Sequence, residues 1–176
     1  MIEATILCGL SCAGKSVGGE FLSHLHDAQH IEASTFMREF WSIHHCTDEG
    51  PDEFAARYLR EKPNAVPMAI LEHGLKLGLK KAIITGLRSI AEIEYSVGAF
   101  SSVQLLLVTA QPSIRYSRSN IRGRSGAPKT QKEFELLDSM QLEMGVADMI
   151  DAPGWEIVEN NSSMAAYQRK LSELTV

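Results

Sequence analysis

Short apolar runs separated by amphipathic stretches recur along the chain. The runs at 4–8, 82–85 and 103–108 are almost free of polar residues, and weaker ones lie at 29–33 and 155–158. A strand without polar alternation is typical of a sheet that is covered on both faces. These runs therefore predict the strands of a parallel sheet.

Helical patterns fill the intervals between these runs. Ser89 with Glu92 and Thr130 with Glu133 have the spacing of capping boxes, which indicates that a helix begins at each. Helices are expected over 15–25, 34–43, 52–61, 65–77, 89–97 and 130–143, from Pro112, and after Ser162 or Ser163. Strands that alternate with helices predict an α/β fold, a three-layer αβα sandwich. A chain of 176 residues suits a single domain, 1–176.

One motif carries specific chemistry. The residues from Gly9 to Ser16, GLSCAGKS, match G-x-x-x-x-G-K-[ST] and lie between a predicted strand and a predicted helix. Gly9 permits a sharp turn, and Gly14 lets the backbone approach phosphate oxygens. Lys15 would reach the β- and γ-phosphates of a nucleotide, and the Ser16 hydroxyl would bind Mg²⁺. The expected ATP-binding residues are Gly9, Ser11, Cys12, Ala13, Gly14, Lys15, Ser16 and Val17.

Charge is unevenly distributed along the chain. The net charge is −5, yet the stretch 111–132 has six basic residues and no acidic one, which leaves −11 for the rest. A body of that charge is a poor general binder of nucleic acid, because phosphate binding depends on clustered positive charge. The basic stretch suits a clamp for a small polyanion, with a solvated helix face as the alternative.

Several classes of protein are disfavoured. No apolar run approaches the ~20 residues of a membrane helix, and the N-terminus lacks the basic start of a secretory signal. Three cysteines without C-x-x-C spacing favour free thiols in a reducing cytoplasm over a disulfide scaffold. A guanine-reading N-K-x-D tetrapeptide is absent, and there is no room for a helicase core. A small kinase remains.

The chain resembles small P-loop nucleotide kinases related to adenylate kinase and dephospho-CoA kinase. Besides GLSCAGKS, the stretch 85–95 (TGLRSIAEIEY) looks like the D-G-[IV]-R-S-x-x-E-x-E-Y motif of one branch. The stretches 122–125 (RGRS) and 128–134 (PKTQKEF) look like its lid and the helix after it. The resemblance implies a five-stranded parallel sheet, an acceptor-binding helical segment at about 34–79 and a lid at about 115–130.

The resemblance also implies roles for arginines. Arg38 resembles an arginine that contacts the acceptor phosphate, although Phe36 replaces the glycine of that motif. Arg88 resembles a second arginine on the acceptor side or on the transferred phosphate. Arg122 and Arg124 resemble catalytic lid arginines, and Arg118 is a further candidate for the acceptor.

One position departs from the family pattern. Thr85 stands where the family has an aspartate that orients a magnesium ligand. Either another carboxylate serves, with Glu92 and Glu94 as candidates, or Mg²⁺ depends on Ser16 and the nucleotide.

The resulting hypothesis is a monomeric or homodimeric kinase that transfers the γ-phosphate of ATP to a nucleoside monophosphate or a dephospho-CoA-like acceptor. Two alternatives stay open. One is a kinase for a hydroxyl of a modified base in DNA, and the other is a nucleotide-binding regulator without transfer chemistry.

Overall fold

The computed structural model describes residues 1–45, 48–123 and 128–175. Within these residues, five parallel strands form one sheet in the order β2-β3-β1-β4-β5. The strands are β1 (Glu3–Cys8), β2 (Gln29–Glu32), β3 (Lys81–Thr85), β4 (Ser102–Thr109) and β5 (Glu156–Glu159). The predicted parallel sheet is confirmed. Ala33, expected at the end of the second strand, instead begins a helix.

The α-helices of the described residues follow the predicted alternation with strands. They are α1 (Lys15–Leu25), α2 (Ala33–His44), α3 (Pro51–Glu61), α4 (Ala65–Lys76), α5 (Ile90–Ala99), α6 (Pro112–Arg122), α7 (Gln131–Gln141), α8 (Ala147–Asp151) and α9 (Met164–Leu174). A short turn, η1 (Leu142–Val146), joins α7 to α8 and is kinked at Gly145, whose φ of +120° is not helical. Both expected caps form, because the hydroxyls of Ser89 and Thr130 accept the amides of Glu92 and Glu133.

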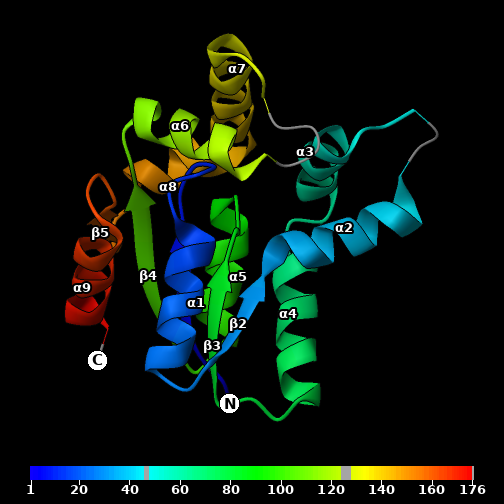
Figure 1. Ribbon diagram of the computed structural model, residues 1–176. Helices are drawn as coiled ribbons and strands as arrows, with labels where there is room; N and C mark the ends of the chain where they lie inside the picture. The colour runs from blue at the N-terminus through cyan, green and yellow to red at the C-terminus, as the bar shows by residue number, and fades with distance from the viewer. Residues whose placement is uncertain (46–47, 124–127, 176) are drawn as a thin grey trace.

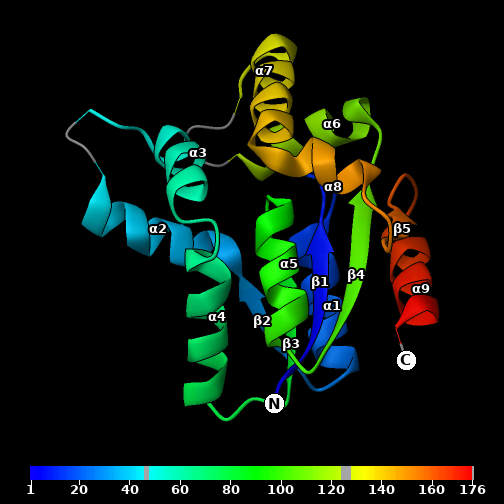
Figure 2. The ribbon, with the colours of Figure 1, turned by 180° about the vertical axis from the view of Figure 1, so that it is seen from behind.

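Two apolar clusters hold the helices to the two faces of the sheet. One contains Leu22 of α1 with Tyr167 and Leu171 of α9, all of them buried. The other includes Ile70 of α4 and Ile93 of α5. The sheet therefore lies between two helical layers, as in the predicted three-layer αβα sandwich, although the edge strand β5 is largely exposed (Figures 1 and 2). No helix of the described residues is long and apolar enough to cross a membrane.

The sheet order places β1 in the centre, between β3 and β4. The chain leaves β1 toward one edge of the sheet and later passes to the other edge through β4 and β5. In parallel sheets a crevice opens where the strand order reverses in this way, at the carboxyl ends of the strands. Helices α6, α7 and α8 lie over this end, and α2 and α3 flank it (Figure 1).

Candidate active site

The loop between β1 and α1 has the backbone shape of an anion-binding nest. Gly9 and Gly14 have φ of +131° and +115°, and Cys12 between them has φ +61°. A Cβ on Gly9 would lie 2.2 Å from the carbonyl oxygen of Val108, so only glycine fits there. No side-chain hydrogen bond caps α1 in the described part of the chain. Its first amides are therefore available to a phosphate group.

Lys15 folds back over this loop. Its Nζ donates to the carbonyl oxygens of Gly9 and Leu10 at 2.7 and 2.8 Å. Burial, helped by the charge of nearby Arg88, lowers the pKa of Lys15 to about 8. An anion bound in the loop would stabilise the charged ammonium group of Lys15. The electrostatics of the loop therefore favour a negatively charged ligand.

A cavity of about 430 Å³ opens over the loop. Its size is within the range of small-molecule sites. Most of the predicted nucleotide contacts line it: Gly9, Ser11, Cys12, Gly14, Lys15, Ser16 and Val17. Ala13, also part of the loop, does not line the cavity. It is buried, and its carbonyl accepts a hydrogen bond from the side-chain amide of Asn160 at 2.8 Å.

Asn160 and Arg118 fix the phosphate-binding loop through hydrogen bonds to its backbone. The Arg118 guanidinium donates to the carbonyls of Cys12 and Ala13 and to Asn160, at 2.9–3.4 Å. Arg118 lines the cavity over the loop, and its role toward the acceptor stays a prediction. Tyr167 adds a bond from its hydroxyl to the carbonyl of Gly14 at 3.1 Å. The loop is therefore held by the segments around β5 and α6.

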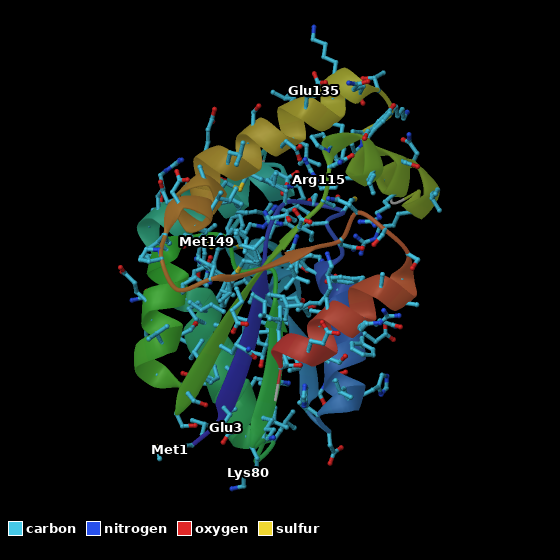
Figure 3. All side chains as sticks on the ribbon, turned by 90° about the vertical axis from the view of Figure 1, so that its left-hand side faces the viewer. Met1, Glu3, Lys80, Arg115, Glu135 and Met149 are labelled. Atoms are coloured by element: carbon cyan, nitrogen blue, oxygen red, sulfur yellow. The ribbon has the colours of Figure 1, made fainter. Side chains whose placement is uncertain are left out.

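The basic stretch divides into different roles. Arg115 is 3% exposed and donates to Asp138 of α7 at 2.7 and 2.5 Å, so its charge is used inside the protein (Figure 3). Arg122 lines the cavity over the loop, and the side chains of Lys129 and Lys132 are exposed. Residues 115–122 of the expected lid belong to α6. Arg124, the other lid arginine, lies outside the described residues.

A second cavity of about 180 Å³ adjoins the first and shares Ser34, Gly86 and Arg88 with it. Arg38 lines this second cavity, and its guanidinium bonds the hydroxyls of Ser34 and Thr35 at 3.3 and 3.2 Å. The rest of the wall comes from α2, α3 and α4, which are the helices of the expected acceptor segment, and from Glu92 of α5. The structure thus brings Arg38 and Arg88 to one cavity beside the loop.

The loop between β3 and α5, residues 86–89, contains Arg88 and is called the Arg88 loop. A buried carboxylate, that of Glu92, fixes this loop. One oxygen of Glu92 accepts the amides of Arg88 and Ser89 at 2.7 and 3.0 Å. Burial raises the pKa of Glu92 to about 7, and these hydrogen bonds only partly oppose the rise. Glu92 therefore supports the loop from inside, whereas Glu94, the other carboxylate considered for magnesium, is exposed.

Thr85 lies at the carboxyl end of β3 and lines the first cavity. Its hydroxyl is 3.0 Å from Nε2 of His30. The strand register pairs Thr85 with Glu32, the last residue of β2, and Glu32 lines the same cavity. Sequence reasoning missed Glu32, although its place at the end of a predicted strand was a usable signal.

Gln141 and Asn160 were also missed. Both are buried and bond the loop, yet they lie far from it along the chain. Neither belongs to a recognisable motif, so only the tertiary structure reveals them.

Solved structures with this fold include P-loop kinases. A gluconokinase from Sinorhizobium meliloti superposes with a TM-score of 0.62 at 17% identity, covering 96% of this chain and 89% of that one. A shikimate kinase from Bacteroides thetaiotaomicron gives 0.62 at 15% identity, covering 99% and 98%. At such identities the likeness establishes the fold, including the predicted P-loop architecture.

Relatives by sequence carry a family name without an assigned activity. Comparison with models of known families gives no match. A UPF0200 protein of Methanopyrus kandleri is 32% identical over 106 residues, 57% of this chain and 54% of that protein. One of Saccharolobus islandicus is 28% identical over 177 residues, 99% and 93%. One of Pyrobaculum aerophilum is 30% identical over 124 residues, 70% and 71%. The chain belongs to the UPF0200 family.

Proposed function

We propose that this protein is an ATP- and Mg²⁺-dependent kinase. The observation that carries the proposal is the junction of two cavities at Arg88, one over the phosphate-binding loop and one among α2, α3 and α4. Phosphoryl transfer needs a donor and an acceptor held in line and a positive charge beside the moving group, with little other chemistry from the protein. Lys15 and Arg88 both line the first cavity, where that charge is needed.

The first cavity suits the donor nucleotide. Loop amides and the N-terminus of α1 would bind the phosphates, and Lys15 would pair with the terminal ones. Arg122 lines the same cavity at the end of α6, so it can approach a bound triphosphate. Arg124 is proposed as a second arginine of this kind from the sequence alone.

The residues around Ser16 suit Mg²⁺. Ser16, Thr85 and Glu32 supply hydroxyl and carboxylate oxygens to one cavity, and Mg²⁺ prefers such hard ligands. We assign the carboxylate role to Glu32, because it lines the first cavity together with Ser16 and Thr85, whereas Glu92 and Glu94 do not line that cavity. When bound, the ion would neutralise charge on the phosphates.

The second cavity suits a small anionic acceptor. Arg38 and Arg88 line it together, and paired arginines are well matched to a phosphate or carboxylate group. A nucleotide-like acceptor, either a nucleoside monophosphate or a dephospho-CoA-like molecule, is the candidate suggested by the resemblance to nucleotide kinases. Arg38 would bind its anionic group, and Arg88 would face both acceptor and donor.

An acceptor screen with γ-labelled ATP and Mg²⁺ tests this function. The screen covers nucleoside monophosphates, dephospho-CoA, small hydroxy acids and duplex DNA with and without hydroxymethylated bases. Lys15→Ala should abolish labelling, and Lys80→Ala, an exposed lysine at the opposite end of the sheet (Figure 3), should leave it unchanged. Label in DNA would replace the small acceptor by a nucleic acid. ATP binding without any labelled product would favour a regulatory protein.

A further inference from the structure

One continuous segment touches both halves of the proposed active site. The end of α7 and the kinked turn η1 pass over the carboxyl ends of the strands on the way to α8 (Figures 1 and 2). Gln141 and Val146 of this segment line the first cavity.

Gln141 is hydrogen-bonded to the phosphate-binding loop through both polar atoms of its side-chain amide. Its Oε1 accepts the backbone amide of Ser11 at 2.9 Å, and its Nε2 donates to the Ser11 hydroxyl at 2.7 Å. The residue is buried, 6% exposed. Because both polar atoms of the side chain are used on one residue, the loop has a defined position relative to α7.

Four residues later the same segment meets the Arg88 loop. Gly145 has φ +120°, and a Cβ at this position would lie 3.0 Å from the carbonyl oxygen of Arg88 and 3.2 Å from Cα of Ser89. The sulfur of Met144 lies 3.8 Å from the Arg88 guanidinium, as a weak acceptor. At Gly145 the turn η1 has no side chain, so its backbone packs closely against the backbone of the Arg88 loop.

We propose that Gln141 is a positioning residue of the nucleotide site, and that the segment Gln141–Val146 sets the spacing between the phosphate-binding loop and Arg88. The inference rests on the proposed function, because spacing matters only where a donor and an acceptor must meet. Reacting atoms have to approach within roughly 3–3.5 Å in the correct line. A buried glutamine and a closely packed glycine, four residues apart, connect both loops to one short segment of the chain.

Two variants separate the two contacts, and each has a matched control. Gln141→Leu removes both bonds to Ser11, and Gln131→Leu makes the same change on the exposed start of α7. Gly145→Ala adds a Cβ against the Arg88 loop. Gly154→Ala adds a Cβ at another positive φ, +92°, where no atom lies within 4 Å.

Calorimetry with Mg²⁺ and adenylyl imidodiphosphate gives the nucleotide Kd, and hydrogen exchange reports on residues 86–92 with and without that analogue.

Gln141→Leu should raise the Kd about tenfold, as expected for two hydrogen bonds lost from the loop. Gly145→Ala should keep the Kd within about twofold. The bound analogue should slow exchange at 86–92 in the wild type but not in this variant. Both controls should behave as the wild type. If Gln141→Leu does not fold, Ser11→Ala, which removes one of the two bonds, should raise the Kd about threefold.

A Kd unchanged by Gln141→Leu, or by Ser11→Ala in its place, would overturn the positioning role of Gln141. Wild-type exchange at 86–92 that ignores the nucleotide, or protection retained in Gly145→Ala, would overturn the link to Arg88. Neither result would affect the proposed kinase function. A wild-type protein that does not bind the analogue at all would instead remove the proposed function.

Discussion

The protonation of Lys15 should make nucleotide affinity depend on pH. Its Nζ is enclosed by the carbonyls of Gly9 and Leu10, and burial with the nearby charge of Arg88 lowers its pKa to about 8. A bound triphosphate pairs with the ammonium group and raises this pKa again. Binding therefore favours the protonated lysine, and affinity falls as the pH rises through the pKa of the free protein.

The size of the effect follows from that pKa. Below pH 7 Lys15 is almost fully protonated, and affinity is at its maximum. At pH 9, one unit above a pKa of about 8, roughly a tenth of the lysine is protonated. The affinity for a triphosphate should then be about tenfold lower than at neutral pH, or ~1.4 kcal/mol. Binding at pH 9 should take up close to one proton per site.

Calorimetric titration of adenylyl imidodiphosphate with Mg²⁺ between pH 6.5 and 9.5 measures this dependence. Two buffers with different ionisation enthalpies give the proton uptake. Lys15→Arg is the matched control, because a guanidinium stays charged over the whole range. Its affinity should be nearly independent of pH. Equal affinities of the wild type at pH 7 and 9, or an equal fall in Lys15→Arg, would refute this reasoning.

Three other substitutions test the supports of the site. Arg115→Met leaves a largely buried carboxylate without its partner and should cost about 3–5 kcal/mol of unfolding free energy in urea. Arg57→Met, which breaks more exposed ion pairs, should cost much less, and equal costs would contradict this account. Gly9→Ala forces a Cβ to 2.2 Å from a backbone carbonyl and should abolish nucleotide binding in calorimetry, whereas Gly78→Ala meets no atom within 4 Å and should retain it. The raised pKa of Glu92, about 7 against 4.5, means that stability present at low pH is lost as the pH rises through 7, by about 3 kcal/mol. Glu92→Gln should flatten this fall in urea titrations from pH 5 to 8, and an unchanged slope would show that Glu92 is not its source.

The sequence predicted the sheet, most of the helices and the phosphate-binding loop because these features depend on local patterns. Apolar runs of strand length mark the buried strands, and the capping box at Ser89 forms as expected. At Thr130 the hydroxyl caps the helix, but the Glu133 carboxylate accepts the amide of Lys129 instead of that of Thr130. The helix expected over 130–143 matches α7 closely, but the pattern did not predict η1 and α8 after it. The chain turns there at Gly145, which packs against the Arg88 loop, a contact that no local pattern encodes.

The basic stretch shows the same limit for the site. Its composition indicates a clamp for a polyanion, but composition does not distinguish a charge facing a cavity from a charge used inside the protein. Arg115 is paired with Asp138, and Arg118 is bonded to backbone carbonyls. These carbonyls lie more than 100 residues from Arg118 along the chain, so only the tertiary structure reveals them as its partners.

Position 85 carries a hydroxyl where the nucleotide kinases that the chain resembles have an aspartate. A hydroxyl at the end of β3 cannot supply the negative charge of that aspartate, yet the parallel register places Glu32 directly beside it on β2. Neighbouring strands lie about 4.8 Å apart, so a carboxylate moved by one strand remains within reach of the same ion or water. On the proposed function, the charge near Ser16 has therefore moved from one strand end to the next, and a motif search along β3 alone cannot find it.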